Sequence, residues 1–272
     1  MEKETVKYLI KKTLSNYSSI AADFDRTRGF SWRIMQEFAK FVKPGDVVLD
    51  FGCGNGRLLD SLEIENIVYK GVDPVPEFIN IARQKYQDVT AFDQSARGLA
   101  IKTKRSMEFK VMDFDVDDFK IDFPDKYFNH IFAIAVFHHL PSRELRKNVL
   151  KEFKRILKDD GCIFISVWNL WQGKHLFEIL KFFLMKISGK IIGGRFLRGW
   201  YDGVSVADLD SGDLFIDYTT TDKNIVVRRY HHAFCKKGIS DMAKDAGLRP
   251  KKIFYDDKGF NICAIIRASS KI

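Results

Sequence analysis

The stretch VVLDFGCGNG at residues 47 to 56 decides the fold. An apolar run ends in Asp50 and turns into a loop with glycine at every second position, at Gly52, Gly54 and Gly56. This order predicts a buried parallel strand followed by a tight loop and a helix, where missing Cβ atoms let backbone amides approach a ligand closely. The ligand predicted from the loop is a nucleoside.

Strand-like and helix-like segments alternate downstream of this loop. Strands are predicted at 67 to 73, 107 to 113, 127 to 136 and 162 to 168, with helices from Pro76 to about Tyr86 and over 142 to 157. Later strands are predicted at 224 to 230, near 251 to 255 and at 261 to 268, with a helix from about 237 to 246. The alternation predicts a doubly wound α/β fold with a mostly parallel sheet, closed by a reversed strand hairpin.

The length of the connections suggests how this single domain is organised. Pro44 and Gly45 mark the entry to the first strand, and 171 to 224 is longer than a connector needs to be. One domain, 1–272, is therefore predicted in four parts: an N-terminal helical cover at 1–43, a cofactor-binding core at 44–170, a helical insert or lid at 171–224, and strands with a helix that complete the sheet at 225–272.

Composition narrows the class of protein. The chain has 272 residues, of which 46% are hydrophobic, so it can bury a sizeable core, and its formal charge of +9 favours a polyanionic partner. Four scattered cysteines without a C-x-x-C pair, and no signal peptide pattern, predict a reduced cytoplasmic protein. The apolar stretch 176 to 192 carries too many charges to span a membrane. We expect it to pack as an amphipathic helix, with membrane-surface binding as the less favoured alternative.

Acidic residues stand at the ends of three predicted strands. Asp50 precedes the glycine loop, Asp73 ends the second strand, and Asp113 with Phe114 ends the third. Asp73 can accept hydrogen bonds from both ribose hydroxyls, and Asp113 from an adenine amine with Phe114 near the ring. The alternate glycines differ from G-x-G-x-x-G, the spacing that seats a pyrophosphate. Each acid taken alone is equally explained as an ordinary strand-end carboxylate.

Together these motifs resemble those of the class I (type 11) S-adenosylmethionine-dependent methyltransferases, over roughly residues 40 to 170. The resemblance implies a Rossmann-like sheet of seven strands and S-adenosylmethionine as the cofactor. It implies cofactor contacts at Asp50, Gly52, Cys53, Gly54, Asn55, Gly56, Asp73, Pro74, Asp113, Phe114, Ala133 and Ala135.

The end of the fourth strand indicates the kind of acceptor. Its sequence, AIAVFHHLP at 133 to 141, lacks the Asn or Asp-Pro-Pro-aromatic turn typical of base-amine methyltransferases. It also lacks the cysteine nucleophile that base-carbon methyltransferases need. An oxygen acceptor or an activated carbon remains.

A closer resemblance is to the eukaryotic-type tRNA wobble-uridine carboxymethyl methyltransferases. It rests on NYSSIAADFDRTRGFSW at 16 to 32, AIAVFHHL at 133 to 140, SVWNLWQ at 166 to 172 and RRYHHAF at 228 to 234. It implies O-methylation of the carboxylate of 5-carboxymethyluridine in tRNA, with a small zinc-binding activator protein as a partner. The basic connection near 91 to 106 and the insert after Gln172 do not match that family.

The same resemblance implies roles for residues far apart in the chain. It places Tyr17 near the cofactor and implies an acceptor pocket formed by Arg28, Trp32, His139, Trp168, Asn169, Arg229 and His232. A carboxylate is already ionised at neutral pH, so the pocket needs mainly to desolvate and align it. Arg28 or Arg229 can hold one of its oxygens, and Trp32 or Trp168 can stack on the uracil.

Other interpretations of these residues stay open. His138 and His139 are also explained as satisfied strand-end side chains, and Trp168 as core packing. No metal site is predicted, because adjacent histidines on an extended strand point to opposite faces. The same rule separates His231 from His232, and the resemblance favours His232 for the pocket.

Basic residues and alternative functions complete the predictions. We expect a group of basic residues to contact the backbone of an anticodon stem; the alternative is that they only face solvent. They are Lys102, Lys104, Arg105, Lys174, Lys186, Lys190, Arg195 and Arg198. No membrane partner is expected.

The sequence leaves two alternatives to a tRNA methyltransferase. They are a small-molecule or lipid-intermediate O- or C-methyltransferase, and a catalytically silent scaffold that binds the cofactor.

Overall fold

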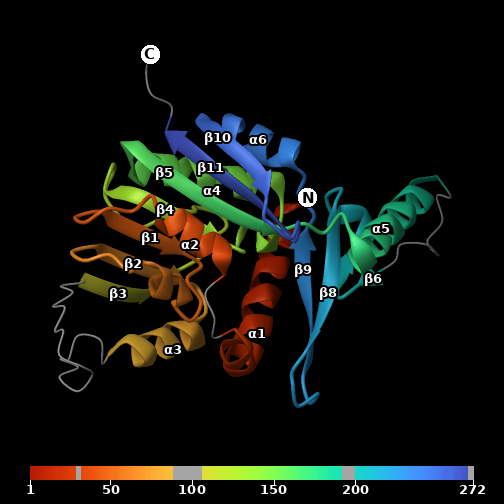
Figure 1. Cartoon of the computed structure of the whole chain (residues 1–272). Coiled ribbons are helices and arrows are strands. Elements are labelled where there is room, and N and C mark those ends of the chain that lie inside the picture. The colour runs from red at the N-terminus through yellow and green to blue at the C-terminus, as the bar shows by residue number, and fades with distance from the viewer. Residues whose placement is uncertain (29–31, 88–105, 192–199, 269–272) are drawn as a thin grey trace.

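Seven strands form the central sheet of the computed structural model, which describes residues 1–28, 32–87, 106–191 and 200–268 (Figure 1). Their order is β10-β11-β5-β4-β1-β2-β3. The bounds are β1 Val47–Phe51, β2 Val68–Asp73, β3 Ser106–Val111, β4 Phe128–Ile134, β5 Leu157–Trp168, β10 Leu248–Tyr255 and β11 Asn261–Ala268. The strands from β5 to β3 pair in parallel, whereas β11 runs antiparallel to both β5 and β10. The predicted α/β fold and its reversed closing hairpin are confirmed.

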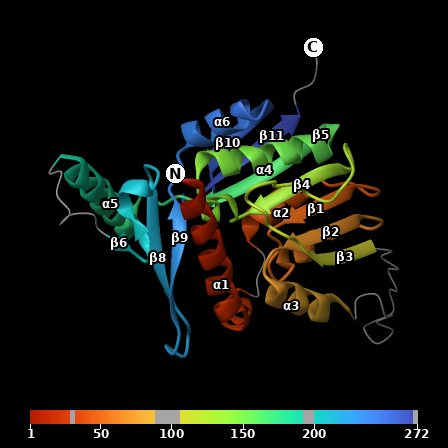
Figure 2. The same ribbon diagram turned by 180° about the vertical axis from the view of Figure 1, so that it is seen from behind.

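Helices cover both faces of this sheet, as the views from the front and from behind show (Figures 1 and 2). They are α1 Lys3–Thr27, α2 Arg33–Ala39, α3 Pro76–Gln87, α4 Arg143–Ile156 and α6 Lys236–Asp245, whereas α5 Gly173–Ile191 stands apart from this sheet. One face is packed by α4, α6 and the start of α1, the other by α2 and α3. In α4, the Ser142 side chain accepts the Leu145 N–H and caps the helix, and Leu145, Val149 and Phe153 form its buried face.

The glycine loop leaves β1 as expected, and the helix that follows it is a short 3-10 helix, η1 Arg57–Ser61. The Gly52 and Cys53 N–H groups both donate to the Val72 carbonyl, so the loop turns back onto β2. Gly52 has φ +72°, and a Cβ there would lie 2.5 Å from a Val136 methyl carbon. Only glycine fits this turn without displacing the end of β4.

A second, smaller sheet corrects the prediction that all of 225–272 completes the main sheet. β9 Val226–His232 pairs antiparallel with β8 Asp213–Thr219 in a separate hairpin, so only β10, β11 and α6 of that range join the central layers. The hairpin stands beside α1 in both ribbon views (Figures 1 and 2). The Asn16 side chain donates to the Arg228 carbonyl at 2.6 Å, which fixes β9 against α1.

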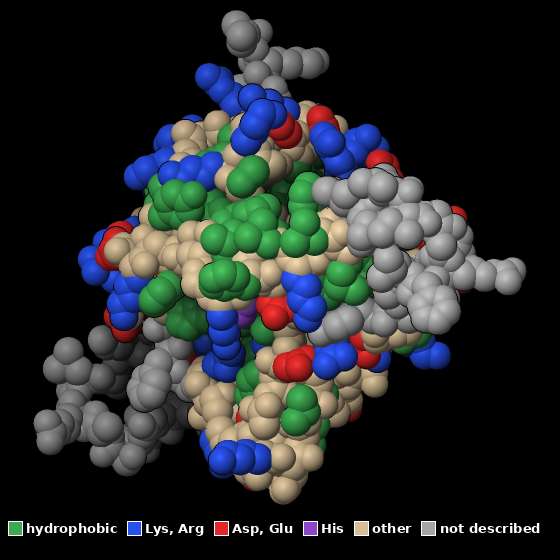
Figure 3. All heavy atoms as spheres, turned by 90° about the vertical axis from the view of Figure 1, so that its right-hand side faces the viewer, with side chains coloured by type: hydrophobic (Ala, Val, Ile, Leu, Met, Phe, Trp, Pro, Cys, Tyr) green, Lys and Arg blue, Asp and Glu red, His purple; other side chains and the backbone are tan. Residues whose placement is uncertain are grey.

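The helix α5 is only partly packed. Ile179 and Phe182 are buried against the second sheet, but Phe177 and Leu184 are 74% and 64% exposed. Apolar side chains gather over the middle of the molecular face on this side (Figure 3). Across the described ranges, no helix combines the length and apolar character needed to cross a bilayer.

Candidate functional site

A cavity opens at the carboxyl ends of β1, β2 and β4, where an open α/β sheet places its ligand crevice. The space within and above it amounts to about 980 Å³, its open mouth included. Helix α1 forms the opposite wall through Thr13, Leu14 and Tyr17. The predicted cofactor residues that line it are Asp50, Gly52, Cys53, Gly54, Asn55, Asp73, Pro74, Phe114, Ala135 and Tyr17.

Two buried carboxylates mark one end of this cavity. Asp73 accepts the backbone N–H groups of Gly54 and Val75, both at 2.9 Å, and its burial raises its pKa to about 6. Asp50 accepts the Tyr69 hydroxyl at 2.7 Å, and burial raises its pKa to about 7. Neither acid forms an ion pair within the described part of the chain, so a positively charged ligand would compensate both.

Other predicted cofactor residues lie away from this wall. Asp113 is exposed and does not line the cavity; its neighbours Met112 and Phe114 do. Ala133 is fully buried in the sheet, and Gly56 faces the rings of Tyr86 and Phe109. Asp113, Ala133 and Gly56 therefore do not line the cavity themselves, whereas residues next to them in the sequence do.

A second group of side chains joins α1, the turn that follows β4, and β9. The Tyr17 hydroxyl lies 2.7 Å from Nε2 of His139, and Nδ1 of His139 lies 3.1 Å from the Tyr230 carbonyl. The carbonyl can only accept, so His139 carries its proton on Nδ1 and accepts from Tyr17 at Nε2. Burial and the Arg229 charge lower the pKa of His139 to about 3, which keeps the ring neutral. Arg229 donates to the Tyr17 hydroxyl at 3.1 Å.

Two guanidinium groups face this region without a carboxylate partner. Arg229 is 3% exposed, and no acid within the described ranges lies within ion-pair distance of it or of Arg28. The guanidinium carbon of Arg229 lies 4.9 Å from the centre of the Tyr218 ring, and that of Arg28 lies 5.9 Å from it. Burial lowers the pKa of Arg28, and the Arg229 charge lowers it further. A buried cation and a half-buried one, with no carboxylate partner in the ranges that the structure describes, indicate a site for an anion.

Three histidines meet beside these groups. The ring centroids of His138 and His139 are 4.3 Å apart because residues 137–139 form the 3-10 turn η3 Phe137–His139, so our argument from an extended strand was wrong. Their ligand atoms and that of His231 lie within 4.8 Å of one another. Nδ1 of His138 accepts the Trp168 N–H, which leaves a proton on Nε2. Burial, followed by the charges of neighbouring residues that include Arg229, lowers the pKa of all three rings. Neutral imidazole is the form that binds metals, so the absence of a metal site stays a prediction.

The structure brings His231, rather than His232, to this group. The His231 ring stacks on Trp168 at 5.2 Å with an interplanar angle of 22°. His232 instead lies 2.6 Å from the Asp213 carboxylate, on the other side of β9. The prediction of His232 in the pocket is therefore corrected.

Trp32, Trp168 and Asn169 line a separate groove beside the cavity. Trp32 also packs over the Arg57 guanidinium, whose carbon lies 4.2 Å from the ring centre. Arg57, which we did not predict, lines the cavity, and burial lowers its pKa to about 10. The predicted acceptor residues thus fall into two neighbouring places, with the Arg28, His139 and Arg229 group at one and the two tryptophans and Asn169 at the other.

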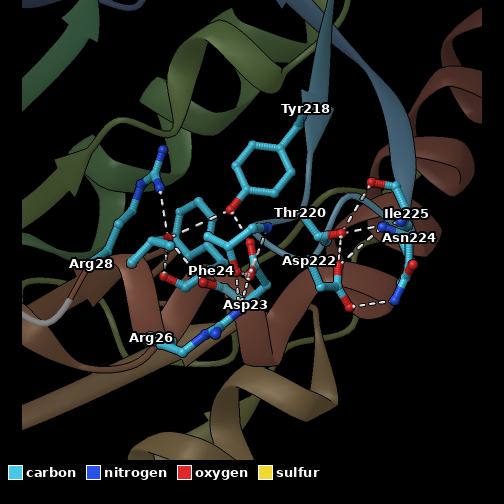
Figure 4. A network of polar contacts seen from close by, with 11 residues as sticks. Asp23, Phe24, Arg26, Arg28, Tyr218, Thr220, Asp222, Asn224 and Ile225 are labelled. Atoms are coloured by element: carbon cyan, nitrogen blue, oxygen red, sulfur yellow. Dashed lines mark hydrogen bonds and ion pairs between the residues drawn. The ribbon is translucent and has the colours of Figure 1, made fainter.

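A network of polar contacts ties the end of α1 to the tip of the β8 and β9 hairpin (Figure 4). Asp23 lies at its centre and accepts the Tyr218 hydroxyl at 2.7 Å and the Thr221 backbone N–H at 3.1 Å. These hydrogen bonds, with those of Thr221 Oγ1 and Arg26, hold the pKa of Asp23 well below its usual range. This network, which we call the clasp, holds Tyr218 of β8 against α1. Because β8 pairs with β9, it also positions the strand that carries Arg229.

The predicted basic surface is described only in part. Lys174 is exposed at the edge of the groove, and Lys186 donates to the Leu209 carbonyl. The others fall outside the described residues or side chains: Lys102, Lys104, Arg105, Lys190, Arg195 and Arg198.

Comparisons with known proteins agree with this geometry. A family model described as a methyltransferase domain matches residues 25–201. The chain is 27% identical over 179 residues to the Mus musculus protein named "Probable tRNA methyltransferase 9B", covering 65% of this chain and 34% of that protein. It is 29% identical over 157 residues to the tRNA (carboxymethyluridine(34)-5-O)-methyltransferase of Saccharomyces cerevisiae, covering 58% of this chain and 48% of that protein. The chain thus spans about a third to a half of the length of these relatives.

A solved structure supports the fold. A chain of the complex between the Haloferax volcanii Trm112 methyltransferase activator and a methyltransferase superposes with a TM-score of 0.56. The superposition covers 96% of this chain and 99% of that chain at 17% identity, a level at which only the fold is shared.

Proposed function

Because the chain belongs to the methyltransferase domain family, we propose that it transfers a methyl group from S-adenosylmethionine to the carboxylate of a modified wobble uridine, of the 5-carboxymethyluridine type, in tRNA. The observation that carries the proposal is the pair of guanidinium groups, Arg28 and Arg229, with no carboxylate partner in the described ranges. A carboxylate acceptor would supply the missing negative charge.

The cavity itself suits the cofactor; its lining includes Tyr17 and His139 but neither Arg28 nor Arg229. S-adenosylmethionine supplies a methyl group on a positively charged sulfonium. Asp50 and Asp73 are buried acids that form no ion pair within the described ranges, and they would hold the methionine end and the ribose respectively. A cationic donor beside the acids and an anionic acceptor beside the arginines would be brought together by complementary charges.

The neighbouring titratable groups fit an acceptor that needs no deprotonation. His139 is neutral, but its Nε2 lone pair already accepts the Tyr17 hydroxyl. Burial raises the pKa of Tyr17, so it stays protonated and can donate. Neither group is free to remove a proton from an alcohol or amine, whereas a carboxylate needs only to be aligned and kept dry.

The relatives support the substrate and suggest a partner. The Saccharomyces cerevisiae relative is named for methylation of carboxymethyluridine 34, and the Haloferax volcanii structure contains a methyltransferase activator. We therefore propose tRNA as the substrate, a small zinc-binding activator protein as a partner subunit, and the cytoplasm as the location. The formal charge of +9 fits an RNA substrate.

Methyl transfer to a synthetic anticodon stem-loop tests the proposal directly. With labelled S-adenosylmethionine, the stem-loop that carries 5-carboxymethyluridine should gain an alkali-labile label, and the same stem-loop with plain uridine should gain none. Arg229→Met keeps the length of the side chain but removes its charge, and should lower kcat/KM on the order of 100-fold. Arg228→Met is the matched control, because Arg228 pairs with Asp217 on the other face of β9.

The same assay separates the alternatives. Label in a metabolite extract but not in RNA would favour a small-molecule acceptor. Cofactor binding without turnover on either, with Arg229→Met equal to wild type in binding, would favour a silent scaffold.

A further inference from the structure

A groove beside the cavity lies between α2, the start of α5 and the turn that joins β10 to β11. We call it the side groove; it encloses about 1870 Å³, its open side included. Its lining includes Trp168, Asn169, Gln172, Lys174, Lys258 and Phe260. The acceptor site described above leaves most of these residues unused.

The wall formed by the β10 and β11 turn is held rigidly. The Asn169 backbone N–H donates to the Phe260 carbonyl at 2.8 Å. The side chains of Asn169 and Gln172 both donate to the Gly259 carbonyl at 2.9 Å. Asn169 therefore acts as a brace for this wall, in a position where Phe260 projects from a fixed backbone.

Aromatic rings are spaced along the side groove. Phe260 is 61% exposed although it is fully apolar, and it shows no ring contact with another described aromatic side chain. Trp168 lies at the inner end, where its ring is 5.2 Å from that of His138, and the His138 ring is 4.3 Å from that of His139 at the cavity. A line of rings thus leads from the cavity wall to the side groove.

Charges at the side groove favour an anion at the rim. Two of the acids are in ion pairs, Asp257 with Arg33 at 2.6 Å and Glu37 with Lys40 at 2.8 Å. Asp256 keeps its charge and accepts from the neutral Asn261 side chain at 2.6 Å. Lys174 and Lys258 are exposed, and neither has an ion-pair partner in the ranges that the structure describes.

We propose that the side groove binds the unpaired nucleotides next to the methylated uridine, with one base stacked on Phe260 and the phosphates near Lys174 and Lys258. This inference rests on the proposed function and extends it from the modified base to the single strand around it. Rings that stack without reading the base edge, next to a few cations, are the usual means of holding a single strand. A base-paired stem presents no free base face to such a ring, so the site would select an open loop.

A comparison of two exposed aromatic residues on the same hairpin tests this inference. Phe260→Ala removes the proposed stacking ring, and Tyr255→Ala is the matched control, since Tyr255 is 47% exposed but lies outside the side groove under Lys236. Two substrates are compared, a pentanucleotide centred on 5-carboxymethyluridine and the free 5-carboxymethyluridine nucleoside. Fluorescence anisotropy with an unmodified pentauridylate measures binding without methyl transfer.

Phe260→Ala should lower kcat/KM for the pentanucleotide and weaken pentauridylate binding, each by about 10-fold, because it removes the surface on which one base stacks. The nucleoside should react equally with both variants, and thermal unfolding should confirm that both are folded. Equal pentanucleotide kinetics for Phe260→Ala and wild type, or an equal loss on the nucleoside, would overturn the inference but leave the proposed function intact. If wild type methylates neither substrate, the proposed function fails, and the anisotropy comparison alone then decides whether the side groove binds a strand.

Discussion

Cofactor affinity should rise steeply between pH 5.5 and pH 7.5, because both buried carboxylates of the cavity titrate in this range. The pKa of Asp50 is raised to about 7 and that of Asp73 to about 6, in each case chiefly by burial. A cationic nucleoside binds best when both are ionised. On these values, about 0.7% of molecules carry both charges at pH 5.5 and about 74% at pH 7.5, so the affinity should increase about 100-fold.

The direction of this change follows from the raised pKa values. A carboxyl group whose folded pKa lies above its unfolded value is stabilised in its protonated form, and it loses that stabilisation as the pH rises through the folded pKa. A bound cation reverses this preference, so binding releases the protons. His139 adds nothing to the slope, because its pKa of about 3 leaves it neutral throughout.

Isothermal titration calorimetry with S-adenosylmethionine at pH 5.5, 6.5 and 7.5 measures both quantities. Repeating each titration in buffers of different ionisation enthalpy counts the protons, and we expect about 1.7 released per cofactor bound at pH 5.5. S-adenosylhomocysteine lacks the sulfonium charge and should show a shallower dependence. An affinity for S-adenosylmethionine that stays constant over the range, with no proton released, would refute the assignment of the two acids.

Three further variants test the cavity. Asp73→Ala should remove most cofactor binding, because it deletes an acceptor at the cavity. The protein should still fold, although each backbone N–H group left unpaired lowers the free energy of unfolding by about 1–3 kcal/mol. Unchanged affinity by calorimetry would contradict this prediction. Tyr69→Phe removes the hydroxyl that lies 2.7 Å from Asp50, which should raise the pKa of Asp50 and move the midpoint of the affinity profile to higher pH. Gly52→Ala should destabilise the fold by about 1–2 kcal/mol for its φ of +72°, and more for the valine methyl 2.5 Å from the new Cβ. Gly45→Ala, at φ +89° with no atom within 4 Å, is its control in urea unfolding, and equal losses would exclude the steric contribution.

The strand pattern of the core was predictable because apolar runs alternate with amphipathic helices there. Asp50 and Asp73 could be placed together because parallel strands end at one edge of the sheet. Asp113 was misplaced for a local reason. It lies two residues beyond the end of β3, where Met112 and Phe114 take the inward positions. A sequence cannot show which way a chain turns once its strand has ended.

The choice between His231 and His232 was predictable from the alternation of side chains in a strand, which we applied to the two histidines but did not extend to Arg229. In a strand, side chains two residues apart share a face, so Arg229 and His231 must point the same way. β9 is regular over this range, and it places His231 beside Trp168 while His232 meets Asp213. The family resemblance favoured His232, but the alternation of the strand decided the outcome.

Contacts between distant segments had no signal in the sequence. Asp23 meets Thr221 across 198 positions, and Asn169 braces a turn 90 residues later. The 3-10 turn that brings the rings of His138 and His139 together also departs from the extended strand expected from the apolar run. Each of these depends on how packed layers meet, which a single sequence does not encode in any one window.

The clasp joins α1, which is synthesised first, to the β8 and β9 hairpin, which is synthesised late. The glycine loop and both acids leave the ribosome long before β9, which carries Arg229. A nascent chain that ends near residue 200 therefore holds the acidic half of the cavity but has neither the second guanidinium nor the strand that Asp23 anchors. Synthesis therefore completes the residues proposed to bind the nucleoside before those proposed to bind the acceptor, and α6, β10 and β11 follow both.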